Sequence, residues 1–464
     1  MTQASLKPGE GLIEALRAIV GDRGLILGDE AQMRSCDPFR VVPMLGSAIV
    51  RPANTQEVSA VMACCHARGQ RVVVHGGRTG VAGGAYVGEA EIALSLERMN
   101  AIEEIDPVGQ IAVVQAGAVL ETVHHATAEA GLFYPVDLGA KGTATIGGTI
   151  ATNAGGNRVI RWGMTRQNVM GLEAVLPDGT IVSSMNRLLK NNSGYDLKHL
   201  FVGTEGTLGI VTRAVLRLAP LPSTSQLAFV SVPGYDEVLR LLERARKLMS
   251  LSAFEVMWQD YYSIVASVAT GRLPVEPDQP FYVLIETMGY DEDVDRAQFD
   301  AFLEGSYEAG LLVGAVTASS DKQAADFWAI REPQGPVVRA ISPFVTFDIS
   351  LDIARANDFV IEARRLLDVA YSGVRTAVFG HLGDNNIHFS VNAGPDTLMH
   401  EMEIEHLVYD LVSRFDGAIT AEHGIGQLKK AFLPEHRSAA EMETMRRIRD
   451  AIDPNRLLNH DVMF

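Results

Sequence analysis

Hydrophobic positions in the first half of the chain repeat with a helical period in three segments. Residues 12–20 and 119–130 carry apolar side chains every three or four positions, which predicts amphipathic helices. Between them, Asn54 or Thr55 suits the N-cap of a third helix. The apolar face of this third helix would consist of Val58, Val61, Met62 and Cys65.

Strand patterns lie between these helices and continue into the second half of the chain. In the first half they lie at 48–51, 72–74, 92–96, 111–115 and on both sides of the turn Pro177-Asp178-Gly179 within 172–182. In the second half, strands are expected at 281–286 and 345–350, and helices at 235–249 and 354–371. Because helices and strands do not alternate regularly, the predicted fold class is α+β.

The composition changes at the proline-containing stretch 218–222, where we predict the first domain boundary. Residues 1–218 would form one domain, and residues 219–415 would form an antiparallel sheet covered by helices. We expect residues 416–464 to be a C-terminal segment that returns to the first domain.

Two glycine-rich stretches interrupt the hydrophobic pattern. Residues 135–156 read PVDLGAKGTATIGGTIATNAGG, and residues 72–87 read VVVHGGRTGVAGGAYV. Glycine weakens helices and strands but lets the backbone approach another group closely. The N–H groups of such runs can bind a phosphate, most easily where a helix begins. A glycine-rich surface loop is the alternative, but two such loops in one chain favour a phosphate site.

Together the two loops resemble the FAD-binding domain of the vanillyl-alcohol oxidase / p-cresol methylhydroxylase superfamily. The resemblance continues through GTEGTLGIVT, residues 203–212, and implies a two-lobed FAD-binding domain followed by a substrate or cap domain. In that fold both loops wrap the flavin pyrophosphate. The residues that it assigns to the cofactor are His75, Gly76, Gly77, Arg78, Thr79, Gly80, Gly83, Gly84, Pro135, Asp137, Gly139, Gly142, Thr143, Thr145, Gly147, Gly148, Ala151, Thr152, Asn153, Gly155, Glu205, Gly206, Gly209, Ile210, Val211 and Asn459.

Two histidines flank a turn-rich centre in AVFGHLGDNNIHFSV, residues 377–391. If this segment is a hairpin, His381 and His388 are equidistant from its centre and face each other across the strands. Such a pair could bind a metal, and Glu422 could complete a His/His/carboxylate site. The alternative is one structural and one exposed histidine.

This segment and AEHGIG, residues 421–426, resemble signatures of the FAD-dependent D-2-hydroxyacid dehydrogenases, which include D-2-hydroxyglutarate and D-lactate dehydrogenases and the glycolate oxidase flavin subunit. The resemblance implies that His381, His388 and Glu422 bind zinc or manganese. It assigns His423 as the general base and Arg331 as the residue that binds the substrate carboxylate. Asp384 and Asn386 match hairpin positions that would support the ligands.

The sequence departs from that family at three places. Thr346 stands where a lysine is common, and Pro333-Gln334-Gly335-Pro336 breaks a helical run. Both changes bear on the distal group of the substrate. His460-Asp461 replaces Pro-Gly near the rim of the flavin site. Some superfamily members link flavin to a histidine of the first loop, where His75 stands; the dehydrogenases bind FAD non-covalently, and we expect the same here.

The composition of the chain limits which binding partners and which cellular compartment are expected. The 464 residues carry a formal net charge of −17, which argues against nucleic acid and anionic membranes as partners. The N-terminal segment lacks a signal-peptide pattern, and no apolar run approaches a membrane span. The three cysteines form no C-x-x-C pair, so a reducing cytoplasm is expected and electrons would pass to an external carrier. Cys64 and Cys65 are expected to be buried.

The leading hypothesis is a flavoenzyme that oxidises a small anionic D-2-hydroxy acid, with a homodimer as the candidate assembly. The external carrier would be an electron-transfer flavoprotein, a quinone or a cytochrome. A 2-His-1-carboxylate non-haem iron oxygenase is the alternative enzyme class, although it needs no pyrophosphate cradle. A non-enzymatic flavin-binding sensor would leave His423 and Arg331 without a role.

Overall fold

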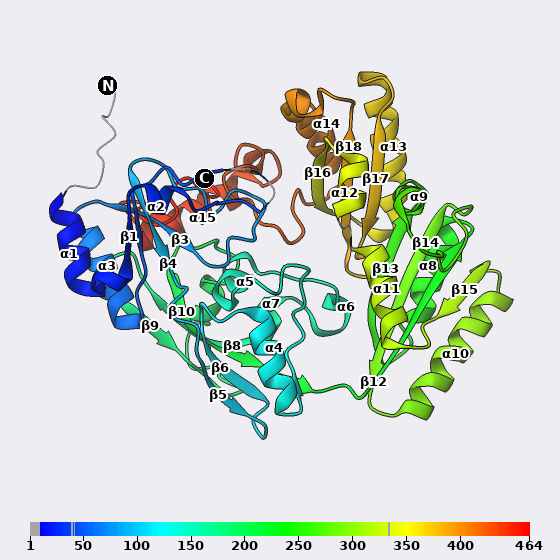
Figure 1. The fold of residues 1–464 in the computed structure, drawn as a ribbon, viewed down its shortest axis with the longest axis horizontal. Helices are drawn as coiled ribbons and strands as arrows, with labels where there is room; N and C mark the ends of the chain where they lie inside the picture. Colours follow the sequence, from blue (N-terminus) through cyan, green and yellow to red (C-terminus); the bar gives the residue numbers. More distant parts are fainter. Residues whose placement is uncertain (1–9, 39, 41, 333–334) are drawn as a thin grey trace. The chain divides into compact units, whose positions relative to one another are not determined.

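The computed structural model describes residues 10–38, 40, 42–332 and 335–464, which form two compact units (Figure 1). Unit 1 runs to Gly156, resumes over Gly163–Leu221 and ends with Glu422–Phe464. Unit 2 consists of Asn157–Trp162 and Pro222–Ala421. The boundaries predicted from the sequence, after residues 218 and 415, lie a few residues before two of the points where the chain passes from one unit to the other. The short segment Asn157–Trp162, which leaves unit 1 for unit 2 and returns, was not predicted.

Unit 1 begins with a small sheet between helices. Its strand order is β1-β2-β4-β3, with β2 and β3 parallel to β4. The strands are β1 (Leu25–Leu27), β2 (Ala48–Val50), β3 (Arg71–His75) and β4 (Glu91–Ser95), and the helices are α1 (Glu10–Val20), α2 (Asp29–Gln32) and α3 (Thr55–His66). The Asn54 side chain accepts a hydrogen bond from the Glu57 N–H and so caps α3, as predicted. The strand at 48–51, expected to be the first, is preceded by β1, which is only three residues long.

The second sheet of unit 1 is antiparallel and has the order β5-β6-β10-β8-β9. Its strands are β5 (Ile102–Asp106), β6 (Ile111–Gln115), β8 (Val169–Val175), β9 (Ile181–Ser184) and β10 (Ile210–Arg217), and β7 (Leu132–Phe133) pairs separately with β11 (Ala219–Pro220). The remaining helices are α4 (Leu120–Glu129), α5 (Ile146–Thr152), α7 (Thr165–Asn168) and α15 (Ala439–Ile452). One hydrophobic core joins both sheets of this unit.

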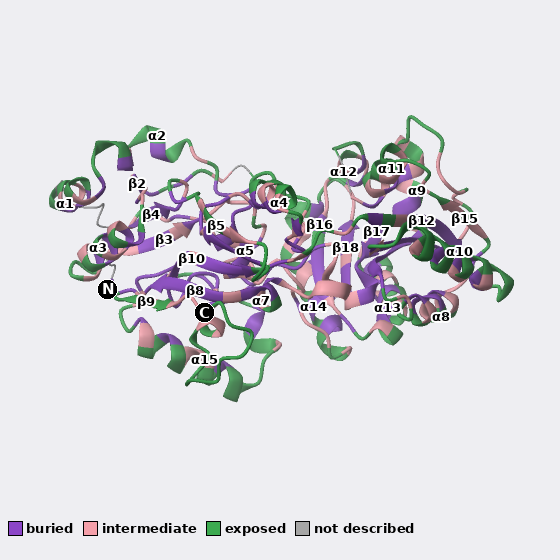
Figure 2. Cartoon of the chain, turned by 90° about the horizontal axis from the view of Figure 1, so that it is seen from below, coloured by how far each residue is buried: buried purple, intermediate pink, exposed green. Residues whose placement is uncertain are grey.

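Unit 2 is built on a seven-stranded antiparallel sheet of order β15-β12-β14-β13-β17-β18-β16. The strands are β12 (Thr224–Val232), β13 (Leu251–Trp258), β14 (Phe281–Gly289), β15 (Gly314–Thr317), β16 (Val345–Ser350), β17 (Arg375–Gly380) and β18 (Asn386–Asn392). The strands in both units are largely buried (Figure 2). The predicted α+β class and the helix-covered antiparallel sheet are confirmed.

Helices cover both faces of the unit 2 sheet. One face packs its apolar side chains against α9 (Gln259–Val268), α11 (Asp321–Arg331) and α12 (Gly335–Ile341). Aromatic contacts such as Tyr235–Trp258 and Phe359–Phe389 join the other face to further helices. These helices are α8 (Tyr235–Ala245), α10 (Glu292–Glu308), α13 (Ala356–Ala370) and α14 (Glu401–Arg414), while α6 (Val159–Trp162) contributes from the short excursion. Because successive strand residues alternate between the faces, each face collects its own set of side chains.

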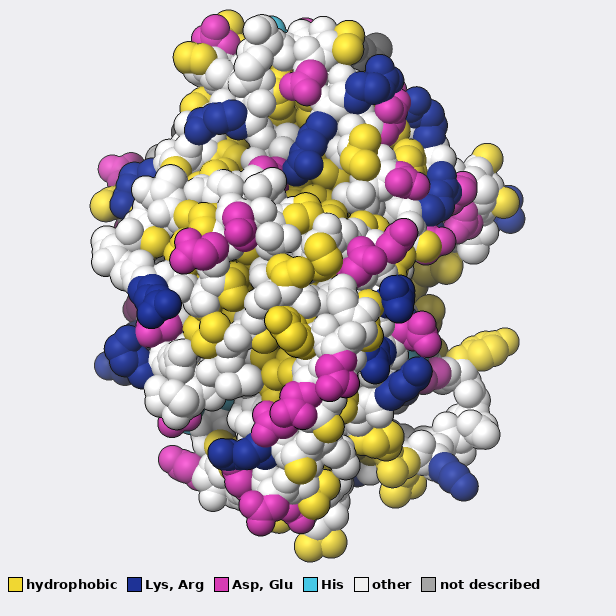
Figure 3. All heavy atoms as spheres, turned by 90° about the vertical axis from the view of Figure 1, so that its right-hand side faces the viewer, with side chains coloured by type: hydrophobic (Ala, Val, Ile, Leu, Met, Phe, Trp, Pro, Cys, Tyr) yellow, Lys and Arg dark blue, Asp and Glu magenta, His cyan; other side chains and the backbone are white. Residues whose placement is uncertain are grey.

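Short 3₁₀ turns complete the structure: η1 (Asp22–Gly24), η2 (Leu197–Leu200), η3 (Ile353–Arg355), η4 (Leu382–Asp384), η5 (Thr397–His400) and η6 (Leu433–Glu435). Among the described residues, no helix is both long and apolar enough to cross a membrane. The view in Figure 3 shows acidic, basic and hydrophobic side chains interspersed on the surface, despite the net charge of −17.

The hairpin predicted at 377–391 is present as β17 and β18, but its register differs from the prediction. His388 lies opposite Phe379, not opposite His381. The turn η4 and Asn385, which has φ of 76°, form the connection and shift its centre toward β17. Left-handed backbone suits asparagine, whose short polar side chain tolerates it.

Two smaller predictions concern buried residues and a helix break. Cys65 is buried as predicted, but Cys64 is only partly buried because it lies at the edge of the apolar face of α3. Helix α11 ends at Arg331, and α12 starts at Gly335. Of the segment 333–336, which was expected to break the helical run, Pro333 and Gln334 lie outside the described residues, and Gly335 and Pro336 begin α12.

Candidate active site

The two glycine loops of unit 1 meet around one open cavity of about 1060 Å³, its solvent-open part included. Both loops reach the wall, together with the segment after residue 200 and part of the C-terminal segment. Predicted cofactor residues in this wall are Gly76, Gly77, Arg78, Thr79, Gly80, Gly84, Thr145, Gly147, Gly148, Ala151, Thr152, Glu205, Gly206, Gly209, Ile210, Val211 and Asn459. The wall also contains His423, the predicted base.

Other predicted cofactor residues do not line this cavity. They are His75, Gly83, Pro135, Asp137, Gly139, Gly142, Thr143, Asn153 and Gly155. Apolar side chains that carry no motif complete the wall instead, among them Val74, Leu96, Leu138 and Phe201. Sequence signals for these residues are weak because any apolar residue of suitable size could serve.

Glycine is required where the two loops touch each other. A Cβ atom on Gly77 would lie 2.2 Å from the carbonyl oxygen of Thr143, and one on Gly76 would lie 2.6 Å from Oγ1 of Thr145. Both distances are far below a van der Waals contact. The first loop can therefore lie against the second only because these positions lack side chains.

Helix α5 carries the second loop to the cavity wall. Thr145 caps it by accepting a hydrogen bond from the N–H of Gly148, at 3.4 Å. The glycine pair 147–148 lies within this helix, although glycine weakens helices. Gly147 packs against Ala116, where a Cβ would lie 2.7 Å from the Ala116 Cβ. Close packing therefore explains a glycine in a helix that glycine itself disfavours.

Glu205 positions the segment that carries His423. Its carboxylate accepts hydrogen bonds of 2.8 Å from the N–H groups of both Ile425 and Gly426. Burial raises the pKa of this carboxyl, although the two N–H donors favour its charged form. Asn459 donates from Nδ2 to the carbonyl oxygen of Glu205 at 2.5 Å. Hydrogen bonds of Glu205 therefore hold the segment 425–426 and Asn459 in place at the cavity.

His75 is fully buried, and its Nε2 lies 2.9 Å from the carbonyl oxygen of Ala85. An N–H at Nε2 therefore donates to that carbonyl, and Nδ1 has no hydrogen-bond partner among the described residues. Burial lowers the pKa of this imidazole to about 4. His75 thus joins the two ends of the first glycine loop through its hydrogen bond to Ala85, and it does not line the cavity.

Unit 2 contains a separate buried cluster of charged side chains, between the middle of β13 and the end of β17. The carboxylate of Glu255 lies 2.6 Å from Nε of Arg331 and 2.8 Å from Nδ1 of His381. Burial opposes the negative charge of Glu255, but His381 and Arg331 together lower its pKa. Arg331, the predicted carboxylate-binding residue, is only 3% exposed and its guanidinium carbon lies 4.8 Å from the centre of the Phe379 ring.

Glu255 was not identified from the sequence. The available signal was a single acidic residue inside LSAFEVMW, a run whose every residue is buried. Charged groups are rarely fully buried unless they are paired, so this glutamate required a basic partner. The sequence does not reveal that the partners come from α11 and from the end of β17.

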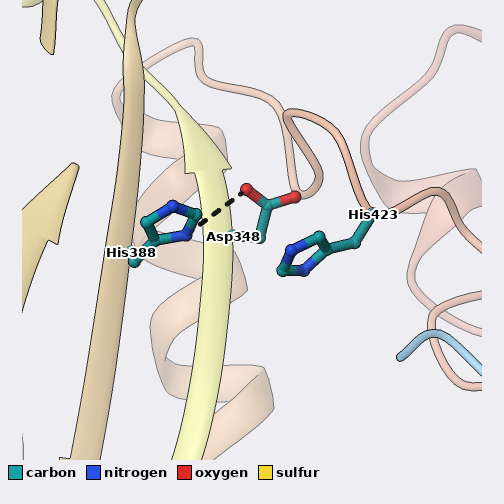
Figure 4. Close-up of side chains that lie close together, drawn as sticks. All are labelled: Asp348, His388 and His423. Carbon is teal, nitrogen blue, oxygen red and sulfur yellow. Dashed lines mark ion pairs between the residues drawn. The ribbon is translucent and has the colours of Figure 1, made fainter. Parts of the chain in front are cut away.

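A second ion pair lies on the adjacent strands β16 and β18 (Figure 4). Asp348 and His388 are register partners, and their Oδ1 and Nδ1 atoms are 3.8 Å apart. Asn386 donates from Nδ2 to Oδ1 of Asp348 at 2.6 Å. The N–H of Ala421, the last residue of unit 2, lies 3.1 Å from Oδ2 of Asp348. Asp348 therefore supports His388 and anchors the chain just before Glu422.

The three predicted metal ligands are divided between the units. A ring nitrogen of His381 and one of His388 lie within 4.8 Å of each other, and their ring centres are 5.4 Å apart. Both are partly or fully buried in unit 2. Glu422 is the first residue of the returning segment of unit 1, where its Oε2 accepts a hydrogen bond of 3.1 Å from the N–H of Gly156. Imidazole and carboxylate donors of this kind suit zinc or manganese.

The position of the missing lysine is occupied by a hydroxyl pair. Thr346 is exposed on β16, and its Oγ1 accepts a hydrogen bond of 3.1 Å from Oγ of Ser390 on β18. The two residues are register partners, two residues along the strands from the pair Asp348 and His388. This part of the sheet therefore presents neutral hydroxyl groups.

Two family descriptions match the chain. "FAD linked oxidases, C-terminal domain" matches residues 221–462, and "FAD binding domain" matches residues 46–184. A D-2-hydroxyglutarate dehydrogenase of Xanthomonas citri pv. viticola is 40% identical over 422 residues, covering 90% of this chain and 89% of that protein. A mitochondrial D-2-hydroxyglutarate dehydrogenase of Bos taurus is 36% identical, covering 96% and 82%. A putative mitochondrial D-lactate dehydrogenase of Schizosaccharomyces pombe is 35% identical, covering 88% and 80%.

Solved structures agree at the level of the fold. Alkyldihydroxyacetonephosphate synthase superposes with a TM-score of 0.76 at 16% identity, covering 99% of this chain and 87% of that one. p-Cresol methylhydroxylase gives a TM-score of 0.75 at 15% identity, covering 98% of both chains. The fold is that of the vanillyl-alcohol oxidase / p-cresol methylhydroxylase superfamily. Within it, the chain belongs to the family of FAD-linked oxidases that includes the D-2-hydroxyglutarate dehydrogenases, and it is a FAD-linked oxidoreductase.

Proposed function

We propose that this protein oxidises a D-2-hydroxy acid to the 2-oxo acid with FAD as the acceptor of the hydride. The observation that carries this proposal is that His423 lines the same cavity as the two glycine loops. A base at that wall is within reach of a substrate beside the cofactor. The named relatives act on D-2-hydroxyglutarate or D-lactate, which supports the same reaction class for this chain. Membership of the FAD-linked oxidases argues against the iron-oxygenase alternative, and a pure sensor would not need a base.

FAD would lie in the cavity with its pyrophosphate on the N–H groups of the glycine loops. The close approach of Gly77 to Thr143 leaves these loops with exposed backbone and little side-chain bulk. We propose that the cofactor is bound without a covalent link, since His75 is buried behind the loop and its Nε2 is engaged by Ala85. When bound, FAD supplies a hydride acceptor to a substrate at the His423 side of the cavity.

Arg331 would bind the α-carboxylate of the substrate, because its planar guanidinium can donate two parallel hydrogen bonds. His381, His388 and Glu422 would hold a zinc or manganese ion. The nearness of the two histidines supports this set, as does the hydrogen bond that anchors Ala421 immediately before Glu422. When bound, such an ion lowers the pKa of a coordinated hydroxyl. His423 would then take the hydroxyl proton on its imidazole as hydride leaves Cα.

The distal end of the substrate would lie where Thr346 and Ser390 form their hydroxyl pair. A second carboxylate finds no lysine at this position, so we propose that short or less charged D-2-hydroxy acids are accepted alongside D-2-hydroxyglutarate. Electrons would leave through an external carrier, an electron-transfer flavoprotein, a quinone or a cytochrome. The cytoplasmic location and the homodimer stay predictions, and several relatives are named as mitochondrial.

The test is anaerobic reduction of the flavin in the purified yellow protein. Absorbance should bleach with D-2-hydroxy acids and not with their L-enantiomers, and rates on D-2-hydroxyglutarate, D-lactate and an apolar homologue rank the substrates. His423→Ala should keep its FAD and slow bleaching by about 10²- to 10⁴-fold, the usual contribution of a general base. Chelation should stop bleaching without releasing FAD, and zinc or manganese should restore it. If no D-2-hydroxy acid reduces the flavin bound to the wild-type protein, the proposal is wrong.

A further inference from the structure

One buried carboxylate contacts two of the residues that the proposed reaction uses. Glu255 lies on β13 and is 1% exposed. Its Oε2 accepts from Nε of Arg331 at 2.6 Å, and its Oε1 accepts from Nδ1 of His381 at 2.8 Å. The strands explain the arrangement: Val256 pairs with Gly380, so continuing the antiparallel register places Glu255 opposite His381. A single side chain thus bridges helix α11 and the end of β17.

The bridge determines which nitrogen of His381 carries the proton. A carboxylate oxygen only accepts hydrogen bonds, so the neutral imidazole must have its N–H at Nδ1. The lone pair then lies at Nε2, the atom that a metal ion would use. Nη2 of Arg331, which can only donate, lies 3.2 Å from Nε2 and favours the same tautomer in the metal-free protein; this N–H would have to turn away for an ion to bind at Nε2.

The same bridge orients Arg331. Glu255 takes the Nε side of the guanidinium, while Nη2 lies 3.2 Å from Nε2 of His381. The guanidinium also lies against the Phe379 ring, its central carbon 4.8 Å from the ring centre. The hydroxyl of Tyr261 donates to the backbone carbonyl oxygen of Arg331 at 3.1 Å and so holds the backbone at the end of α11. The end formed by Nη1 and Nη2 therefore has one orientation, and it is the end that can receive a carboxylate as a fork.

We propose that Glu255 is a positioning residue that sets both the tautomer of His381 and the direction of Arg331. It would act through the two residues that it bridges, Arg331 and His381. This inference rests on the proposed function, because it assigns metal binding to His381 and carboxylate binding to Arg331. The tautomer itself does not depend on that assignment and can be measured without substrate or metal.

Glu255→Gln is the informative variant. An amide of nearly the same shape has one oxygen and one NH₂ group, so it cannot accept from both Arg331 and His381. If the oxygen stays with Arg331, the NH₂ group faces Nδ1 of His381 and forces the proton onto Nε2. Metal affinity should then fall by about 10- to 100-fold, the usual cost of losing such a supporting contact.

Glu286 provides a matched control on the neighbouring strand β14. It is also a buried glutamate, 3% exposed, and it is also paired with an arginine: Nε of Arg158 lies 3.2 Å from its Oε2. Its carboxylate also accepts a hydrogen bond of 2.7 Å from Oγ of Ser252. Glu286→Gln therefore removes the same charge from the same sheet without contacting His381.

The first measurement is the histidine tautomer, read from long-range ¹H–¹⁵N correlations of metal-free protein labelled at histidine and assigned with His381→Gln. Wild type and Glu286→Gln should show the Nδ1–H form at His381, and Glu255→Gln should show the Nε2–H form. The second measurement titrates Zn²⁺ and Mn²⁺ into each protein. The third compares KM and kcat, and Glu255→Gln should raise KM for the D-2-hydroxy acid about tenfold or more, whereas Glu286→Gln changes it less than twofold.

The outcomes separate this inference from the proposed function. A wild-type His381 in the Nε2–H form overturns the role of Glu255 whatever the reaction proves to be. Equal metal affinity in wild type and Glu255→Gln, with affinity lost in His388→Ala, overturns it while leaving the metal site intact. Conversely, a tautomer that switches as expected in a protein that binds no metal through His388 supports the orientation by Glu255 and removes the metal from the proposed function.

Discussion

Two buried acids of unit 2, Glu255 and Asp348, hold the histidines that the proposed reaction uses. The histidines of the hairpin and the glycines of both loops were identified because few other roles need those residues at that spacing. Glu255 and Asp348 sit among apolar residues in predicted or actual strands, where one acid is hardly visible. Their partners come from other elements, so only the packed structure shows what each acid does.

Among single residues, His75 should make stability depend on pH. Its folded pKa is lowered to about 4 by burial, whereas an unfolded histidine titrates near 6.5. The unfolded state therefore binds more protons between these values, and stability is full above pH 6.5 and falls as the pH drops toward 4. The full shift corresponds to about 3 kcal/mol. Urea unfolding of the apoprotein at pH 7 and pH 5 measures the loss.

His75→Gln serves as the control for that pH effect. Glutamine can still donate to the carbonyl oxygen of Ala85 but does not titrate, so the variant should lose less stability between pH 7 and pH 5 than the wild type. Equal losses in the two proteins would show that titratable groups other than His75 dominate the loss of stability in acid.

At the scale of elements, the hydrophobic pattern of the sequence correctly predicted the long strands and the amphipathic helices. It did not predict the glycine-rich helix α5. Periodicity correctly located α1, α3 and α4, since each needs only one apolar face. The helix at 146–152 was missed because its stability comes from close packing of a glycine on Ala116, a long-range contact. The hairpin register was missed for a related reason: the turn conformation at Asn385, not the symmetry of the motif, sets it.

The two glycines of α5 should therefore respond differently to alanine. A methyl group on Gly147 would lie 2.7 Å from Cβ of Ala116, so Gly147→Ala should lower the melting temperature of the protein. At Gly148 it would meet only Oγ1 of Thr145, at 3.3 Å. Gly148→Ala should keep the fold and gain up to about 1 kcal/mol of helix propensity, yet bind FAD more weakly because the methyl group enters the cavity.

Thermal unfolding of the apoproteins and FAD titration distinguish the two effects. If Gly148→Ala binds FAD as tightly as the wild type, α5 does not contact the cofactor. Loss of FAD from Gly147→Ala alone would then indicate an indirect effect through the packing of α5.

At the scale of the whole molecule, the chain passes between the units four times. The predicted boundaries, after residues 218 and 415, lie near the two later passages between the units. The segment Asn157–Trp162 was not predicted, because six residues are too few to show a recognisable pattern. It belongs to unit 2 because Arg158 pairs with buried Glu286 and because Arg161 donates to the carbonyl oxygens of Ser250 and Met288. Unit 2 is therefore completed by six residues that directly follow the second glycine loop.

Arg158→Met should destabilise unit 2. It would leave Glu286 charged, buried and without its partner, which typically costs about 3–5 kcal/mol. The double variant Arg158→Met, Glu286→Gln removes both charges and should recover most of that loss. Thermal unfolding of the full-length variants, followed by tryptophan fluorescence, gives the comparison; a double variant as unstable as the single one would mean that the arginine stem, not its charge, matters.

The return of the C-terminal segment to unit 1 has a consequence for how the protein is made. Leu457 accepts a hydrogen bond from the N–H of Val72 on β3, and the side chain of Asn459 accepts one from Val74, 385 residues earlier. At about 5–20 residues per second, a ribosome delivers the later partner roughly 20 to 80 s after the earlier one. During that interval the edge of β3 lacks its hydrogen-bond partners Leu457 and Asn459, while all of unit 2 is synthesised. The cavity that Asn459 lines is therefore completed only after all of unit 2 has been synthesised.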